Sequence, residues 1–169
     1  YEEITEIVKI GISLGIKKVR ITGGEPLVRL GVTDLVHKLN QIDGLEEISM
    51  TTNGVLLSKY GAKLKEAGLD RVNISLDTLS KEKFKQITGR DDFDKVMKGI
   101  ETALEVGLDP VKINVVVIKG VNDDEILDFV KLSKTNFLNI RFIEFMPLGY
   151  KEKFQSEKYL SLEDIKAKI

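Results

Sequence analysis

The chain has 169 residues, with 26 Lys and Arg against 27 Asp and Glu, one His and no Cys. This length suits a single domain, residues 1–169, that can bury a sizeable core. The formal charge of -1 argues against nucleic-acid binding through a global basic field, and no apolar run approaches the ~20 residues of a membrane helix. The lack of Cys excludes disulfides, thiolate zinc sites and iron–sulfur ligation by this chain. No signal peptide is visible, so we expect a cytoplasmic protein.

Helical and strand-like patterns alternate along the chain. The first part predicts a helix at 4–14, a strand at 17–22, a helix capped by Thr33 or Asp34, a strand at 47–52, a helix at 57–67 and a strand at 71–77. The second part predicts a short helix capped by Ser80, a helix from Asp92 or Asp94 to Glu105, a strand at 111–118, a helix opened by Asp123 and Asp124, a strand at 138–146, an irregular loop at 148–160 and a helix from Ser161. This alternation is typical of βα units with a parallel sheet.

The predicted strands place polar side chains on one face only, because successive side chains point to opposite faces. The polar sets are Arg20 and Thr22; Ser49, Thr51 and Asn53; Asn73, Ser75 and Asp77; and Lys112 and Asn114. Strands buried on both faces would be apolar throughout. We therefore expect a partial (βα)6 barrel with about five of six core strands, whose polar interior holds a ligand near the carboxyl ends of the strands. The alternative is a polar core whose residues satisfy one another.

The charges on this face are mixed. Arg20 and Lys112 suit an anion such as a phosphate, whereas Glu25 and Asp77 suit hydroxyls or an ammonium group. Such a site predicts two ligands, or one zwitterionic and one phosphorylated group. In the last strand, Arg141 and Glu144 have opposite parity, which the pattern does not explain.

Several residues also have ordinary structural interpretations. His37 is expected on a helix surface, Asn53 followed by Gly54 favours a turn, and Asp77 can cap the helix that follows it as well as bind a hydroxyl. The segment 120–124 indicates a turn and a helix N-terminus, where two acids disfavour phosphate.

Five motifs occur in an order that resembles one enzyme family. They are RITGGEPL (20–27), SMTTNG (49–54), VNISLD (72–77), KIN (112–114) and RFIEFMP (141–147). The glycine pair after a strand resembles the S-adenosylmethionine-binding motif of radical SAM enzymes, and two glycines allow close backbone approach to a ligand. Together the motifs resemble the GTP 3',8-cyclase family of molybdenum cofactor biosynthesis (molybdenum cofactor biosynthesis protein A), over essentially the whole chain.

The resemblance implies a lyase and a set of site residues. Gly24, Ser75 and Met146 would contact S-adenosylmethionine, with Glu25 near its amino group. Arg20, Thr51 and Lys112 would contact the substrate GTP, and the further candidates are Asn53, Asp77, Asn114 and Arg141. In the family, a [4Fe-4S] cluster cleaves S-adenosylmethionine, and the resulting radical starts the conversion of GTP to a 3',8-cyclised dihydroguanosine triphosphate.

The departure from the family is the missing Cys. The family holds its clusters with a Cys-x3-Cys-x2-Cys motif and with Cys residues of a C-terminal extension, and this chain has neither. We expect the chain alone to be inactive, with no metal site of its own, and to expose a strand edge near 17–22 that favours a homodimer. The alternatives are another radical SAM enzyme, such as a peptide-modifying maturase, or a non-catalytic nucleotide-binding module.

Overall fold

The computed structural model describes residues 1–135, 137–146 and 156–169. Five strands form one sheet in the order β1-β2-β3-β4-β5, and β1 with β2, β2 with β3, and β4 with β5 pair in parallel. The predicted α/β class with a parallel sheet is confirmed. The chain divides into two compact units, one of Tyr1–Ile74 with Lys95–Val111 and one of Ser75–Asp94 with Lys112–Ile169. That the two units form one domain stays a prediction.

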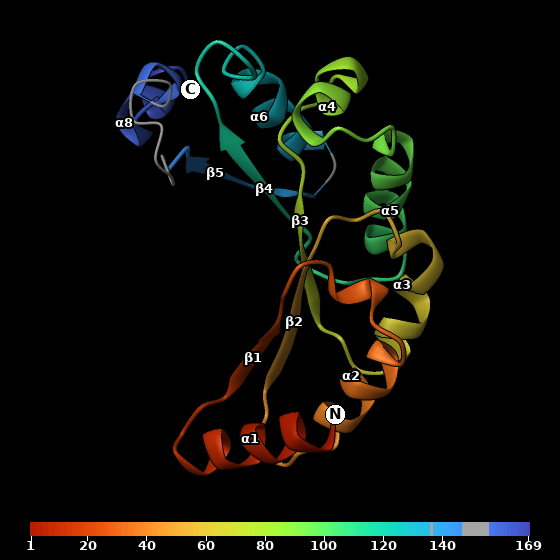
Figure 1. Cartoon of the computed structure of the whole chain (residues 1–169). Coiled ribbons are helices and arrows are strands. Elements are labelled where there is room, and N and C mark those ends of the chain that lie inside the picture. The colour runs from red at the N-terminus through yellow and green to blue at the C-terminus, as the bar shows by residue number, and fades with distance from the viewer. Residues whose placement is uncertain (136, 147–155) are drawn as a thin grey trace. The chain divides into compact units, whose positions relative to one another are not determined.

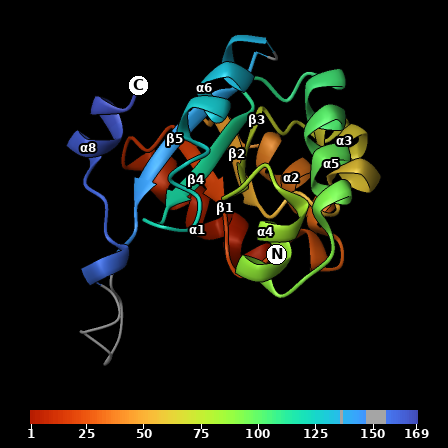
Figure 2. The same cartoon turned by 90° about the horizontal axis from the view of Figure 1, so that it is seen from above.

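The first unit is a strand–helix repeat. It contains α1 (Glu2–Ser13), β1 (Lys18–Ile21), the 3-10 helix η1 (Pro26–Val28), α2 (Val32–Asn40), β2 (Glu47–Thr52), α3 (Leu57–Glu66), all but the last residue of β3 (Arg71–Ser75), and most of α5 (Phe93–Glu105). Figures 1 and 2 show α2, α3 and α5 on one side of β1 and β2. The core lies between them, because Val36, Leu39, Met50 and Leu64 are fully buried there.

The second unit begins at Ser75 and repeats the pattern. It contains α4 (Lys81–Thr88), β4 (Lys112–Val117), α6 (Ile126–Thr135), β5 (Asn139–Glu144), the 3-10 helix η2 (Ser156–Lys158) and α8 (Leu162–Ala167). The predicted cap Ser80 is confirmed, since it accepts a hydrogen bond from the Lys83 amide. Ser161, where the sequence predicts the start of the last helix, is the N-cap of α8 and accepts from the Asp164 amide. Phe129 of α6 packs edge-on against Phe142 of β5.

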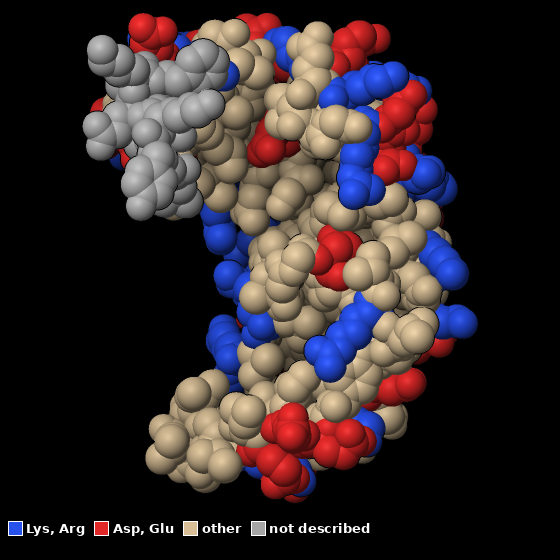
Figure 3. Space-filling model, viewed as in Figure 1, with Lys and Arg blue, Asp and Glu red and all other residues tan. Residues whose placement is uncertain are grey.

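A mixed-charge surface covers α4, as expected for a solvated helix face. Lys81 pairs with Asp94, and Lys83 pairs with Asp124. Figure 3 shows the acidic and basic side chains interspersed over this helix. No helix in the described part of the chain is long and apolar enough to cross a membrane.

The structure corrects several predicted boundaries. The helix α2 has Gly31 as its N-cap, in a left-handed conformation with φ 72°, so the predicted caps Thr33 and Asp34 are wrong. The strand β3 ends at Ser75, two residues before Asp77. The helix α6 begins at Ile126, because Asp123 and Asp124 lie in the turn before it, where Asp123 accepts from the Gly120 amide and Asp124 pairs with Lys83. Pro147 and most of the predicted loop at 148–160 lie outside the described residues.

The unexplained parity of β5 has a structural reason. Glu144 lies on the same face as Ile140 and Phe142, and its Oε1 accepts a hydrogen bond from the Leu162 amide at 2.7 Å. Leu162 is the first residue of α8, whose N-terminus attracts a carboxylate. Glu144 therefore anchors α8 to β5, while Arg141 lies on the opposite face.

The predicted free edge is also present. In the sheet order, β1 is the first strand and pairs with β2 alone among the described strands. Self-association through this edge stays a prediction.

A close backbone contact fixes the turn after β2 against α5. A Cβ atom built on Gly99 would lie 2.2 Å from the Gly54 carbonyl oxygen, so the helix can approach this turn only with a glycine there. Gly54 itself has φ 81°, where a side chain would meet Ile74 and Val96.

We predict that Gly99→Ala lowers the free energy of unfolding by about 1–3 kcal/mol, because the backbone must move apart and the better helix propensity of Ala does not compensate. The measurement is urea unfolding. The control is Gly11→Ala in α1, where the added Cβ meets only the flexible end of Ile16 at 3.3 Å. Equal stability of the two variants would contradict this packing.

Candidate ligand-binding site

Several polar side chains on the strands of the first unit hydrogen-bond to one another. The Arg71 guanidinium donates to Glu47 Oε1 at 2.7 Å, and this contact holds the pKa of Glu47 below its usual value. Arg71 also reaches Asn73 Oδ1 at 3.4 Å, and Asn73 Nδ2 reaches Thr51 Oγ1 at 3.5 Å. These residues therefore fit the alternative prediction of a polar core whose members bind one another. Thr51 is the last member of this series of contacts.

Arg20 lies at the carboxyl end of β1, opposite Ser49 of β2. It is exposed and makes no hydrogen bond or ion pair within the described part of the chain. With Thr22 and Arg29 it lines a cavity of about 240 Å³ whose other walls are mainly apolar. Its guanidinium is thus available to an anion, as the sequence predicts.

The glycine pair after β1 leaves open space. A Cβ atom at Gly23 or at Gly24 would meet no atom within 4 Å. The backbone at this turn is therefore accessible to a ligand, which is the property that the motif requires.

Glu25 joins the ends of β1 and β2. Its Oε1 accepts from the Leu27 amide at 3.1 Å and from Thr52 Oγ1 at 2.7 Å, and its Oε2 accepts from the Asn53 amide at 2.6 Å. This carboxylate is thus a structural link between two candidate ligand-binding turns. The carboxylate has lone pairs left to accept from an ammonium group, and this predicted contact of Glu25 stays a prediction.

The Asn53–Gly54 turn has the ordinary geometry that the sequence also allowed. Asn53 Oδ1 accepts from the Val55 amide at 3.0 Å, and the Gly54 amide donates to Thr52 Oγ1 at 3.1 Å. Sequence reasoning missed Thr52, which binds both Glu25 and this turn. Only a contact across 27 residues reveals that role.

In the second unit, the segment after β3 runs beside β4. The Leu76 amide donates to the Asn114 carbonyl at 3.1 Å, and Asp77 Oδ1 accepts from the Val116 amide at 2.8 Å. Burial raises the pKa of Asp77, and the hydrogen bond from Val116 opposes that effect. Ser75 is exposed at the end of the strand.

The polar face of β4 and β5 carries three candidate residues. Lys112 and Asn114 alternate with buried Ile113 and Val115, and Asn114 lies opposite Arg141 in the parallel register. Asn114 Oδ1 is buried and has no hydrogen-bond partner in the described structure. An unpaired buried acceptor of this kind is costly, so it indicates a place for a donor from a ligand or from water.

Met146 is exposed and directly precedes the residues outside the description. Its predicted contact with S-adenosylmethionine stays a prediction, and Pro147 of the same motif lies outside the described residues.

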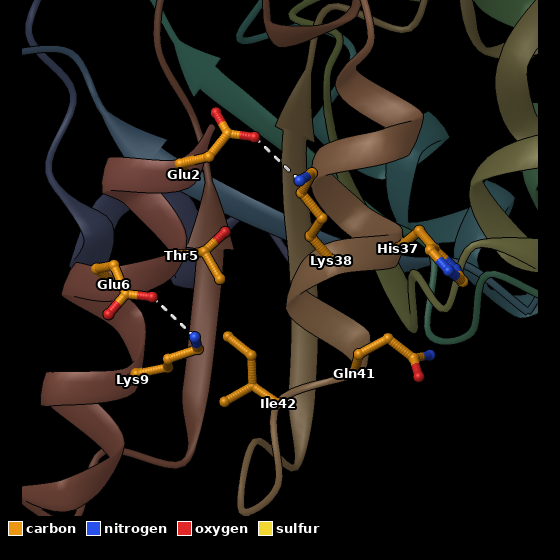
Figure 4. A pocket seen from close by; sticks show the side chains of 8 residues that line it. All are labelled: Glu2, Thr5, Glu6, Lys9, His37, Lys38, Gln41 and Ile42. Atoms are coloured by element: carbon orange, nitrogen blue, oxygen red, sulfur yellow. Dashed lines mark hydrogen bonds and ion pairs between the residues drawn. The ribbon is translucent and has the colours of Figure 1, made fainter.

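His37 is a surface residue, as expected. It lies on α2 beside the groove between α1 and α2, and Figure 4 shows its ring pointing away from Glu2 and Glu6. Across that groove Lys38 binds Glu2 at 3.0 Å, a contact that lowers the pKa of Glu2 to about 2. Within the described ranges, no group of three or more His, Cys, Asp or Glu side chains could hold a metal ion.

Comparison with protein families places the chain. The Radical SAM superfamily matches residues 1–133. The chain belongs to the radical SAM superfamily. The first three motifs that carry the resemblance, between Arg20 and Asp77, lie inside the matched part.

Curated relatives are more specific. The chain is 57% identical over 166 residues to a GTP 3',8-cyclase of Petrotoga mobilis, covering 98% of this chain and 51% of the relative. It is 52% identical over 169 residues to a GTP 3',8-cyclase of Thermodesulfovibrio yellowstonii, covering 100% of this chain and 52% of the relative. The chain spans about half the length of these curated relatives.

Solved structures support the fold. The chain matches a structure of TYW1 with a bound lysine-pyruvate adduct at a TM-score of 0.70 and 20% identity, covering 99% of this chain and 59% of that one. It matches coproporphyrinogen III oxidase (HemN) of Escherichia coli, a radical SAM enzyme, at a TM-score of 0.62 and 13% identity, covering 99% and 44%. The predicted class, a partial barrel of the radical SAM type, is confirmed.

We predict that Glu25→Ala lowers the free energy of unfolding by about 1.5–3 kcal/mol, because three donors lose a charged acceptor. The measurement is urea unfolding. The control is Glu46→Ala, which removes an exposed ion pair with Lys17 and is expected to change the stability by less than about 1 kcal/mol. If the free energy of unfolding falls by less than about 1 kcal/mol in both variants, Glu25 does not join the two turns.

Asp77 predicts a pH dependence of stability. Its pKa is raised in the folded protein, so the free energy of unfolding falls as the pH rises from the ordinary value of 3.8 through the folded-state pKa. Asp77→Asn keeps an acceptor for the Val116 amide and removes this loss. In unfolding titrations, we expect the stability gained by the variant to grow as the pH rises from 3.8 through the folded-state pKa of Asp77, and to stay constant above it. A gain that does not change with pH would contradict burial as the cause.

Proposed function

We propose that this chain is the part of a GTP 3',8-cyclase that binds S-adenosylmethionine and GTP. The observation that carries the proposal is the identity of 51–57% to GTP 3',8-cyclases over at least 97% of the chain. At this similarity the residues at matching motif positions are expected to keep their roles. The enzyme would act as a lyase in molybdenum cofactor biosynthesis.

The residues proposed for S-adenosylmethionine are Gly24, Glu25, Ser75 and Met146. The open space at Gly24 supports a backbone contact there. The unpaired Asn114 Oδ1 and the partly exposed Asp77 supply an acceptor and a carboxylate for hydroxyl groups. When bound, S-adenosylmethionine would supply a radical after one-electron reduction by a donor that this chain does not hold, and these residues would hold it in place.

The residues proposed for GTP are Arg20, Thr51 and Lys112. Asn53 and Arg141 are further candidates for the site, with no ligand assigned to them. Arg20 offers a guanidinium without a partner in the described structure, which suits a triphosphate. Thr51 is oriented by Asn73, so its hydroxyl is positioned before a ligand arrives.

The [4Fe-4S] cluster of the family does not fit the residues of this chain. Cluster ligation requires thiolates, and the chain has no Cys. We derive no step through a cluster, and we expect no cyclase activity from these 169 residues alone.

The test is a calorimetric titration of the chain with S-adenosylmethionine and, separately, with GTP. Saturable binding of both ligands is expected. Gly24→Val should abolish S-adenosylmethionine binding without loss of fold, because the added side chain enters open space. Arg20→Ala and Lys112→Ala should each weaken GTP binding by about tenfold or more, as for a lost charged hydrogen bond.

Each outcome decides a part of the proposal. Unchanged S-adenosylmethionine affinity in Gly24→Val removes that residue from the site. Normal GTP affinity in both charge variants removes the GTP assignment. Binding of S-adenosylmethionine without GTP would favour another radical SAM enzyme, such as a peptide-modifying maturase. No binding of either ligand overturns the proposal that this chain itself holds them.

A further inference from the structure

The turn before α6 contains two buried polar side chains that the proposed function does not use. Asn122 is 2% exposed and Glu125 is 8% exposed, whereas Asp124 between them is exposed. The sequence indicated only a turn and a helix start at 120–124. Burying an amide and a carboxylate costs several kcal/mol unless both are fully hydrogen-bonded.

Asn122 holds the segment after β3 against β4. Its Nδ2 donates to the Asp77 carbonyl at 2.6 Å and to the Val116 carbonyl at 2.9 Å, and its Oδ1 accepts from the Ile118 amide at 2.7 Å. The Val116 amide in turn donates to Asp77 Oδ1. The backbone and the carboxylate of Asp77 are therefore both fixed, at a place where β3 has already ended.

Glu125 holds the next two residues. Its carboxylate accepts from Thr78 Oγ1 at 2.7 and 2.9 Å and from the Leu79 amide at 2.5 Å. Thr78 is buried, and its hydroxyl oxygen accepts from the Ser80 amide at 3.0 Å. Lys83 of α4 pairs with Glu125 at 3.0 Å and balances its charge.

These contacts bear on candidate ligand-binding residues. Ser75 and Asp77 flank Leu76, whose amide binds the carbonyl of Asn114, the residue with the unpaired Oδ1. Asn122 and Glu125 bind Asp77 and Thr78, which follow Leu76. The path of this segment is therefore set by hydrogen bonds from a turn that lies 45 to 47 residues away in sequence.

We propose that Asn122 and Glu125 are positioning residues, which hold Ser75, Asp77 and Asn114 in the arrangement that binds S-adenosylmethionine. This inference rests on the proposed function. A binding site needs its groups within about 0.5 Å of the productive geometry, and a second layer of hydrogen bonds provides that precision. Neither residue needs to touch the ligand.

The first measurement does not depend on a ligand. In Asn122→Ala, the Leu76 and Val116 amides should exchange with solvent about tenfold faster, because the segment that they hold loses its support. The Phe129 amide, which donates to the Glu125 carbonyl at the N-terminus of α6, should keep its rate. Equal acceleration of all three amides, or of none, would overturn positioning in favour of a general structural role or no role.

The second measurement uses Thr78 as a mild probe of Glu125. Thr78→Val keeps the shape and removes the hydroxyl that donates to Glu125, whereas Thr78→Ser keeps the hydroxyl. At a temperature where both are fully folded, we expect S-adenosylmethionine binding to weaken by about tenfold in Thr78→Val and to be retained in Thr78→Ser. Asp124→Asn, in the same turn, is the matched control and should bind normally.

The outcomes separate the two proposals. If the wild-type chain binds S-adenosylmethionine and Thr78→Val binds it equally well, the positioning role is overturned and the proposed function stands. If the wild-type chain does not bind it, the proposed function fails, and the positioning of a site for this ligand fails with it. Loss of binding in Thr78→Val with retention in Thr78→Ser and in Asp124→Asn supports both.

Discussion

The structure depends on the hydrogen bonds that polar side chains form on one face of the parallel strands. A buried amide or carboxylate without a hydrogen bond costs a large part of the stability of a small domain. In the first unit, the contacts from Glu47 through Arg71 and Asn73 to Thr51 meet this requirement internally. In the second unit, the same alternation leaves Asn114 Oδ1 without a hydrogen-bond partner among the described residues. The same alternation thus gives polar side chains that bind one another in the first unit and a buried acceptor that a ligand can use in the second unit.

Five carboxylates accept hydrogen bonds from backbone amides at places where the regular pairing of the backbone stops. Each accepts a hydrogen bond from a backbone N–H group that has no partner in the sheet or at a helix end, and each thereby fixes a turn. The set consists of Glu25 with Asn53, Asp70 with Ile48, Asp77 with Val116, Glu125 with Leu79 and Glu144 with Leu162. These five carboxylates therefore fix loops and turns, whereas other acidic residues, such as Glu46 and Asp94, form ion pairs with lysines.

The sequence predicts what depends on local periodicity. Alternation over 47–52 and 112–117 gives strands, and the same alternation gives the face on which Thr51 and Asn114 lie. The resemblance of motifs supplies the family. What the sequence does not predict depends on contacts between distant segments: the link from Glu25 to Thr52, the role of Glu144 at α8, and the use of Asn122 to extend the support of β3 beyond its last paired residue. Local propensity carries no information on these partners.

The turn at Asn53 and Gly54 has a consequence for the chemical lifetime of the protein. An Asn followed by Gly deamidates when the glycine amide nitrogen attacks the asparagine side-chain carbonyl. Here that nitrogen donates its hydrogen to Thr52 Oγ1, and the close contact with Gly99 holds the turn against α5. The folded state therefore suppresses the attack, and the unfolded chain does not. Deamidation at Asn53 thus records how often this part of the molecule opens.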